Sequence, residues 1–334
     1  MPPLRTKMTV AMWNWRFSKK GTAGVLMMSV AVSWLLTLSS CEKAVMDDSD
    51  VTETTAKGNV VIRVTNVEAG WASSDTRALV NVAEVCSRLC FAVYQDGNRK
   101  SYKNQAVADS DFGTFSLQLE EGIYQILVLA HSGNANPATT NPAKLQFTNP
   151  DSSKGTGFTD TFFYYGDLIV GDEGTQLDIS MKRATAMFRL VTTDVKPAAV
   201  KKFQFYYEGG SGALDATTGL GCIDSKQSVF VTTGDELTGK TLQFDMFTFL
   251  HAEEDEVTFT VKAFSANESI LYEKEFSGVS MQRNCITRYT GDFFTNGDVI
   301  EPDPDEPDTP QPDKPSAVTV MVDPEWGGVF DFTF

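Results

Sequence analysis

Apolar and polar residues alternate along most of the chain with a period of two, the pattern of β-strands that bury one face. Clear examples are 59–67, 200–207, 242–250 and 256–264, and 86–94 is a further, mostly apolar strand-like run. The run 123–131 is apolar at nearly every position, which predicts a strand buried on both faces. No window repeats at 3.6 residues for more than two turns, so helices are not expected. The sequence therefore predicts an all-β fold.

Turn signals join several of these runs. Asp96-Gly97-Asn98 predicts a tight hairpin turn directly after the run 86–94. Glu121-Gly122 separates the alternating run 112–119 from the run 123–131. This spacing predicts that the two runs pair with each other as a hairpin.

The strand runs fall into two cycles. They recur every eight to twelve residues without helices between them, which indicates β-sandwiches, and a second cycle starts after Met181. We predict two tandem β-sandwich domains, residues 59–182 and 183–295. A Pro/Asp-rich linker, residues 296–316, follows them and is extended by proline and by like-charge repulsion.

Residues 317–334 contain two short strand-like runs around a turn. An isolated hairpin is only marginally stable in water, so this one needs a sheet to join. It either folds back onto the second sandwich or adds to the sheet of another subunit. The apolar side chains that would be buried in either case, and that we assign as donor-strand candidates, are Val318, Val320, Val322, Phe330, Phe332 and Phe334.

The first forty residues have the layout of a secretory signal peptide. Five basic residues and no acidic one precede Cys41, and an apolar run, 23–36, ends in small residues directly before it. Small residues before a cysteine favour lipoprotein processing, with mature protein starting at Cys41 and a covalent lipid on its thiol. The alternatives are a transmembrane helix over 21–38 and cleavage at an ordinary site. The polar, acidic segment 41–58 is predicted to be a flexible tether.

The net negative charge of the chain argues against two kinds of partner, nucleic acid and anionic lipid surfaces. The whole chain carries −16, and removing the five basic residues of the signal takes this to −21. Nucleic acid is therefore excluded as a partner, because phosphates require Lys and Arg. Anionic lipid surfaces are disfavoured as well, so we expect membrane contact through the acyl chains alone.

Candidate chemistry is sparse. We favour buried free thiols over disulfides for Cys86, Cys90, Cys222 and Cys285, and we place Cys86 and Cys90 on one face of a strand because they are four residues apart. With only His131 and His251 available, no zinc site, other metal site or cofactor is expected. Both histidines are interpreted as strand-end residues, and no catalytic motif is found, so the protein is not expected to be an enzyme.

The order of these parts resembles the Bacteroidales fimbrillin superfamily. The resemblance rests on the lipid-type cysteine, the acidic tether, the strand 122–130, the segment Phe162-Phe163-Tyr164-Tyr165-Gly166 and the crossover 181–190. It is closest to the FimB-type minor subunits that anchor or regulate the fimbria. It implies two transthyretin-like β-sandwiches, a lipoprotein on the outer-membrane surface, and neighbouring fimbrial subunits that join by β-strand addition.

The resemblance also implies a maturation site in some relatives, where a protease removes the first strand after an arginine. Arg77 lies in a polar stretch after the first strand run and matches such a site in kind. An ordinary loop arginine is the alternative, and an anchor subunit is expected to keep its lipid and its first strand. A different functional class, a surface glycan-binding lipoprotein of a nutrient-uptake system, also stays open.

Overall fold

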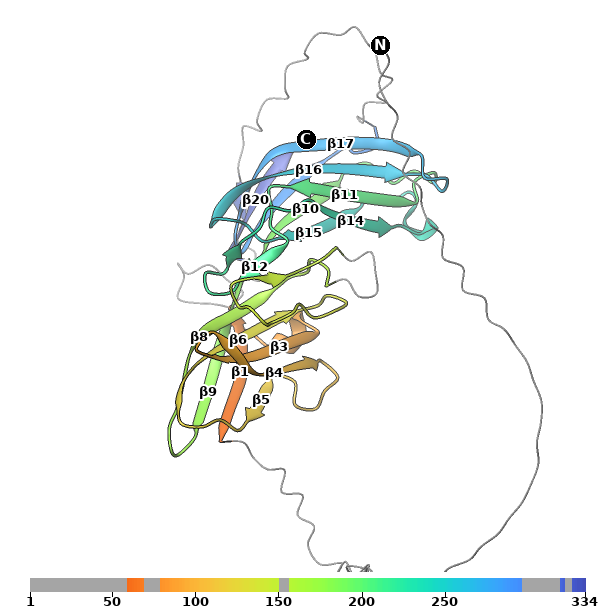
Figure 1. The fold of residues 1–334 in the computed structure, drawn as a ribbon. Helices are drawn as coiled ribbons and strands as arrows, with labels where there is room; N and C mark the ends of the chain where they lie inside the picture. Colours follow the sequence, from red (N-terminus) through yellow and green to blue (C-terminus); the bar gives the residue numbers. More distant parts are fainter. Residues whose placement is uncertain (1–58, 69–78, 150–155, 296–318, 322–325) are drawn as a thin grey trace, which may run out of the picture. The chain divides into compact units, whose positions relative to one another are not determined.

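Nearly every regular element of the described chain is a β-strand (Figure 1). The computed structural model describes residues 59–68, 79–149, 156–295, 319–321 and 326–334. In this part of the chain the helical elements are one short α-helix, α1 (Val82–Val85), and one 3-10 turn, η1 (Asp235–Leu237). The prediction of an all-β fold is confirmed.

The N-terminal strands form an eight-stranded sheet that folds over on itself. Its order is β2 (Leu79–Val80), β1 (Val60–Glu68), β9 (Thr175–Arg183), β8 (Phe162–Val170), β6 (Gly122–His131), β3 (Arg88–Gln95) and β4 (Asn98–Ala106), and β5 (Thr114–Leu117) pairs with β1. β8 and β9 pair only at Phe162↔Arg183 and Phe163↔Lys182. Elsewhere the two strands diverge, so β1, β5 and β9 form one layer and β8, β6, β3 and β4 form the other.

A core of alternate side chains fills the space between these two layers. Val60 and Ile62 of β1 contact the same core as Phe91 of β3 and Ile126 of β6, and all four are fully buried. The opposite face of β3 and β6 is covered too, where Leu127 joins a second core. The prediction that the run 123–131 is buried on both faces is therefore confirmed for its central residues, since Ile126 to Ala130 are all 0% exposed.

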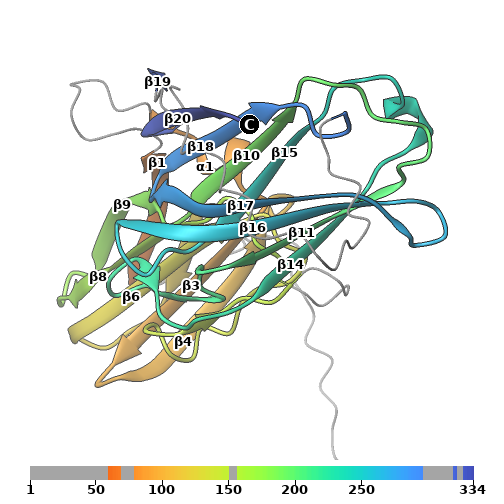
Figure 2. The same cartoon turned by 90° about the horizontal axis from the view of Figure 1, so that it is seen from above.

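Two further sheets enclose the largest core. The five-stranded sheet runs β15 (Gln243–Thr248), β10 (Ala186–Thr192), β18 (Cys285–Gly291), β20 (Gly328–Thr333) and β19 (Thr319–Met321), and Figure 2 shows these strands side by side. The four-stranded sheet runs β14 (Gln227–Thr232), β11 (Lys202–Glu208), β16 (Glu254–Phe264) and β17 (Ile270–Gln282). Between them Phe188 of β10 stacks on Phe259 of β16, with ring centroids 4.1 Å apart.

A small third group of strands ties distant segments together. β7 (Leu145–Gln146) pairs with β12 (Ala213–Asp215), which also pairs with β13 (Leu220–Gly221). Leu145 and Leu214 belong to the second core of the N-terminal sheet, together with Phe249. The long segment between β6 and β8 is thus held to the C-terminal half by backbone pairing and by apolar contact.

One turn prediction is confirmed and the other is wrong. β3 and β4 join through a two-residue turn, in which Asp96 has a φ of 52° and Gly97 a φ of 72°, as a type I′ turn requires. β5 does not pair with β6, because it pairs with β1 in the other layer. Phe115 of β5 and Tyr124 of β6 contact the same core from opposite layers. Residues 118–121 therefore cross the sandwich and do not close a hairpin.

Candidate functional site

The C-terminal strand is added to the edge of β18. β20 runs parallel to β18, from Cys285↔Gly328 to Thr290↔Thr333, and β19 pairs with the outer side of β20. At the two ends the N–H of Gly327 donates to the carbonyl of Asn284 (2.7 Å) and the N–H of Phe334 donates to the carbonyl of Thr290 (3.1 Å). The chain thus completes its own sheet with a strand that follows residues 296–318.

Apolar contacts hold β20 on both faces of the sheet. On one face Val329 and Trp326 are buried against Met187 and Ile286. On the other face the Phe332 ring stacks on Tyr289 at 4.9 Å and the Phe334 ring meets Phe276 edge-on at 5.1 Å.

The donor-strand candidates fall into two groups. Phe330, Phe332 and Phe334 are half-buried in the sheet. Val320 belongs to β19, and Val318 and Val322 lie outside the described residues. The sequence pattern gives no signal for Val329 and Trp326, because the apolar alternation points to Phe330, Phe332 and Phe334 and because Trp326 falls in the predicted turn.

A buried arginine holds the start of β20 through hydrogen bonds and a contact with an aromatic ring. The Arg183 side chain is 2% exposed, and its guanidinium donates hydrogen bonds to both carboxylate oxygens of Asp160, among them one from Nε to Oδ1 (2.9 Å) and one from an Nη to Oδ2 (3.0 Å). It also donates to the Asn284 side-chain oxygen (2.7 Å) and lies over the Trp326 ring at 3.8 Å. A buried charge is tolerated only with such partners. Arg183 therefore links the end of β9, the turn before β18 and Trp326, two residues before β20 begins.

An ion pair lies farther along the face that carries Ile286 and Val329. Arg288 of β18 lies directly opposite Asp331 of β20, and an Nη of Arg288 is 3.2 Å from an Asp331 oxygen. Both side chains are about a quarter exposed. A pair of this kind contributes little stability, but it favours one partner strand and one register over others.

The predicted placement of Cys86 and Cys90 on one face of a strand is wrong. Cys86 caps α1 and packs in the core between the two layers, whereas Cys90 lies within β3 and faces the second core. β3 begins only at Arg88, and Cys86 lies at the end of α1. The two-residue period of a strand therefore does not extend from Cys90 back to Cys86.

The four cysteines in the described part of the chain are unpaired, and two of the buried ones have a raised thiol pKa. All four described cysteines are free, and the expectation that all are buried is wrong for Cys222, which is exposed. Burial raises the pKa of Cys90 to about 12, and burial also raises that of Cys285 to about 12. Both thiols are thus protonated at neutral pH and are poor nucleophiles.

The two histidines occupy structural positions. His131 ends β6 and is fully buried, and its Nδ1 accepts a hydrogen bond from the N–H of Gly133 (3.1 Å). Burial lowers the pKa of His131 to about 4, so the ring is neutral. His251 lies between β15 and β16, with its Nε2 3.2 Å from a carboxylate oxygen of Asp224.

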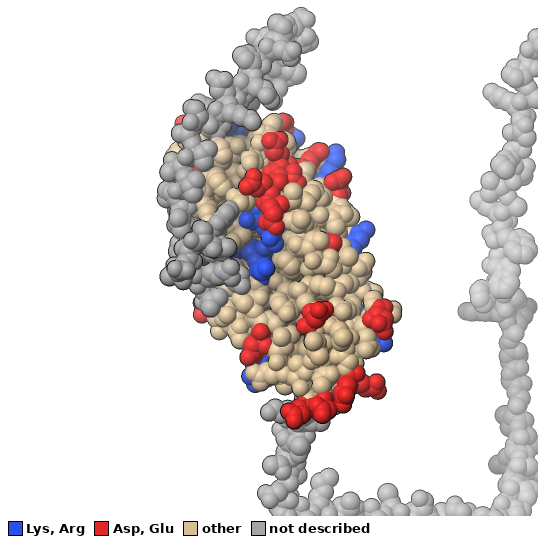
Figure 3. Space-filling view, turned by 90° about the vertical axis from the view of Figure 1, so that its left-hand side faces the viewer, with Lys and Arg blue, Asp and Glu red and all other residues tan. Residues whose placement is uncertain are grey.

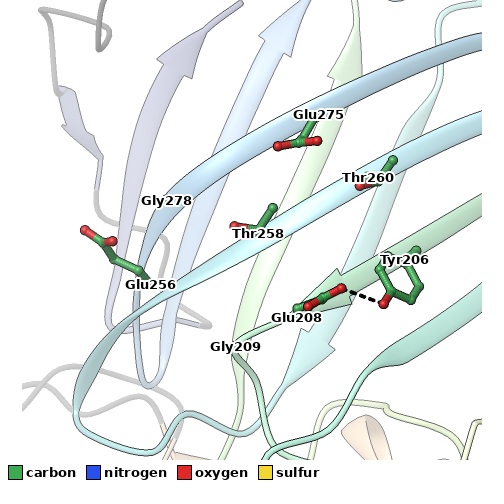
Figure 4. A pocket seen from close by; sticks show the side chains of 8 residues that line it. All are labelled: Tyr206, Glu208, Gly209, Glu256, Thr258, Thr260, Glu275 and Gly278. Carbon is green, nitrogen blue, oxygen red and sulfur yellow. Dashed lines mark hydrogen bonds between the residues drawn. The ribbon is translucent and has the colours of Figure 1, made fainter. Parts of the chain in front are cut away.

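An open, acidic hollow of about 540 Å³ lies on the outer face of the four-stranded sheet (Figure 4). Three carboxylates line it, from Glu208, Glu256 and Glu275. The Tyr206 hydroxyl donates to Glu208 at 2.6 Å, and hydrogen bonds from Tyr206 and Lys226 lower the pKa of Glu208. The hollow is therefore anionic, and Tyr206 is the one aromatic residue in its lining.

Acidic side chains also gather at the lower end of the face in Figure 3. Exposed carboxylates occur in the turn between β8 and β9, at Asp172 and Glu173, and directly before β6, at Glu120 and Glu121. Within the described ranges no group of histidine, cysteine and carboxylate side chains is placed to hold a metal ion. No helix in the described part is long and apolar enough to span a bilayer. Cys41 and Arg77 lie outside the described residues.

Comparisons with known proteins give a family and several distant structures. Similar solved structures include a protein classed as an adhesin from Bacteroides ovatus, with 12% identity and a TM-score of 0.43 over 65% of this chain and 81% of that one. The fimbrial anchor protein Mfa2 from Porphyromonas gingivalis has 16% identity and a TM-score of 0.37 over 66% of this chain and 82% of that one. A fimbrial assembly protein from Parabacteroides distasonis has 16% identity and a TM-score of 0.34, over 71% and 91%.

No curated protein matches the chain. A family model described as a family of unknown function, DUF6562, matches residues 52–328. This match includes strands of every sheet described above and ends at the first residue of β20. The chain belongs to the DUF6562 family.

Proposed function

We propose that the chain is a lipoprotein of the outer-membrane surface that acts as a fimbrial subunit, in an anchor or accessory role, and joins its neighbours by β-strand addition. The observation that carries the proposal is the addition of β20 to β18. This strand comes from the far end of the chain, after a segment rich in proline and aspartate. A sheet that accepts a strand delivered in this way is suited to accept or offer the same joint between subunits.

The sequence supplies the other parts of the proposal. Cys41 would carry the lipid, and residues 41–58 would hold the sandwich away from the membrane. The resemblance to the fimbrillin superfamily connects this tether with fimbrial assembly. The alternative of glycan binding has less support, because the hollow of Figure 4 offers one aromatic ring whose hydroxyl is already bonded to Glu208.

An anchor role also requires Arg77 to remain uncut. Cleavage there would detach β1 from the rest of the chain. β1 pairs with β9 on one side and with β2 and β5 on the other, and Val60, Ile62 and Val67 are all fully buried. We therefore expect mass spectrometry of the cell-derived protein to find the lipidated N-terminus joined to β1.

Deletion of residues 317–334 tests the proposal. The shortened chain should lose most of its co-purification with neighbouring fimbrial subunits while its far-ultraviolet circular dichroism keeps the all-β signature. Trp326→Phe in the full-length chain is a matched control, because it keeps an aromatic ring over Arg183. Normal assembly by the shortened chain, with only a lower melting temperature, would show that the hairpin merely completes its own sandwich.

A further inference from the structure

The two halves of the chain repeat one strand arrangement. In the first half β1 pairs parallel with β9 and antiparallel with β5. In the second half β10 pairs parallel with β18 and antiparallel with β15. Arginines occupy matching positions, since Arg63 of β1 lies opposite Asp178 and Arg189 of β10 lies opposite Arg288. β9 is therefore the counterpart of β18, and Asp178 is the counterpart of Arg288.

The backbone of β18 shows what this outer edge can bind. The carbonyl of Thr290 accepts a hydrogen bond from Phe334, so the alternate residues Ile286, Arg288 and Thr290 direct their backbone groups to β20. The same three positions in β9 are Gln176, Asp178 and Ser180.

Most of the corresponding edge of β9, from Gln176 to Ser180, has no backbone partner among the described residues. The N–H of Thr175 donates to Asn59, so Thr175 and every second residue after it face β1. Gln176, Asp178 and Ser180 consequently point the other way, toward β8. β8 pairs with β9 only at Lys182 and Arg183, so among the described residues nothing pairs with the outer edge of β9 from 176 to 180.

Side chains near this edge determine which strand would fit. Gln176 and Asp178 are exposed, and Ile169 at the end of β8 is 67% exposed. In the second half the partner strand places Asp331 opposite Arg288. A strand like β20 in the same register on β9 would place Asp331 opposite Asp178, and directly opposed like charges are destabilising.

We propose that the outer edge of β9, at Gln176, Asp178 and Ser180, accepts a β-strand from a neighbouring subunit of different sequence. The incoming strand runs parallel to β9 and carries Lys or Arg opposite Asp178. This inference rests on the proposed function, because it takes the partner to be another subunit. The inference specifies where the strand binds, at the edge of β9. It also specifies why a strand of another subunit is preferred to a second copy of β20, namely the negative charge of Asp178.

Two synthetic peptides test the charge preference on the full mature chain, residues 41–334. One has the native sequence 326–334 and the other carries Asp331→Lys. The Lys peptide should bind about fivefold more tightly, the size of a favourable cross-strand charge pair, and should slow amide exchange at Asp178 and Ser180. The Asp178→Lys chain should reverse the order of the two peptides. Equal binding of both peptides, or protection confined to β18, would overturn the proposal.

A second pair of variants tests the edge itself. Gln176→Pro removes a backbone N–H that points away from β1, and an edge strand tolerates proline at such a position. It should abolish binding of the Lys peptide, whereas Gln176→Ala, which keeps the N–H, should bind as the wild type does. If Gln176→Pro still binds the peptide, the β9 edge is not the acceptor.

The two proposals fail differently. Loss of co-purification on deletion of 317–334, together with no peptide protection at β9, refutes the acceptor edge and leaves the fimbrial function standing. Peptide binding at β9 by a chain that never associates with fimbrial subunits supports the edge as a strand acceptor and refutes the fimbrial function.

Discussion

Truncation of Trp326 should release the C-terminal strand while the rest of the protein stays folded. Trp326 is 6% exposed, and its ring lies between the Arg183 guanidinium at 3.8 Å and the Phe247 ring at 6.2 Å. Trp326→Ala removes both contacts and leaves Val329 with fewer neighbours. Because residues 296–318 separate the hairpin from the preceding strand, the loss should act on the docking of β20 and not on the larger cores.

The size of the effect follows from burial. Removing a buried Trp side chain typically costs about 3–5 kcal/mol, which corresponds to an increase of roughly a hundredfold to several thousandfold in the population of the open form. The cation–π contact with Arg183 is part of that cost, since a desolvated contact contributes about 2 kcal/mol. Trp326→Phe keeps a ring in this position and should lose much less.

Native-state amide hydrogen exchange measures this directly. In Trp326→Ala the amides of Ile286, Arg288 and Thr290, which face β20, should lose protection by that factor. The amides of Thr287 and Tyr289, which face β10, should keep theirs. Equal loss at both sets of amides, or a matching fall in the global free energy of unfolding, would refute a separately docked hairpin.

Three further predictions concern other parts of the chain. Cys41→Ser should move the protein from the membrane fraction to the soluble fraction, and unchanged fractionation would refute lipid attachment. The buried neutral His131 has a pKa of about 4 instead of 6.5. Between pH 6.5 and pH 4 the unfolded state therefore binds a proton that the folded state does not. The free energy of unfolding should fall by roughly 3 kcal/mol from pH 7 to pH 4. In denaturant titrations, His131→Leu should make the free energy of unfolding less dependent on pH over this range. Gly219→Ala should lower the melting temperature, because Gly219 has a φ of +80° and a Cβ would lie 2.2 Å from the Phe163 ring.

The all-β class and the buried central strand could be predicted because they follow from alternation alone. The β3–β4 turn could be predicted because Asp96 and Gly97 tolerate positive φ. The pairing of β5 with β1 could not be predicted, because alternation identifies a buried face without identifying the layer that it belongs to. Phe115 and Tyr124 reach one core from opposite sides, and a short connection between two strands is read equally well as a hairpin or as a crossing.

The candidate site was predictable in part. The apolar alternation of residues 328–334 identified a strand that needs a sheet, but not that it runs parallel to β18. The role of Arg183 had no sequence signal, because its partners Asp160, Asn284 and Trp326 come from three separate segments. Contacts of this kind depend on tertiary structure, and local patterns carry no information about them.

The two halves share one strand arrangement but differ in whether the edge strand is already joined by another strand. The edge of β18 is occupied by β20, with Arg288 matched by Asp331. On β9 the stretch from Gln176 to Ser180 has no backbone partner among the described residues and carries Asp178 at the position of Arg288. An unprotected edge is normally an aggregation hazard, and inward or central charges are one way to limit it. Asp178 would exclude a second copy of β20 and accept a basic strand, so the charge reversal between Arg288 and Asp178 would favour joining to a different subunit over self-polymerisation. An anchor or accessory subunit needs this selectivity, because it must join a fimbria without growing one from copies of itself.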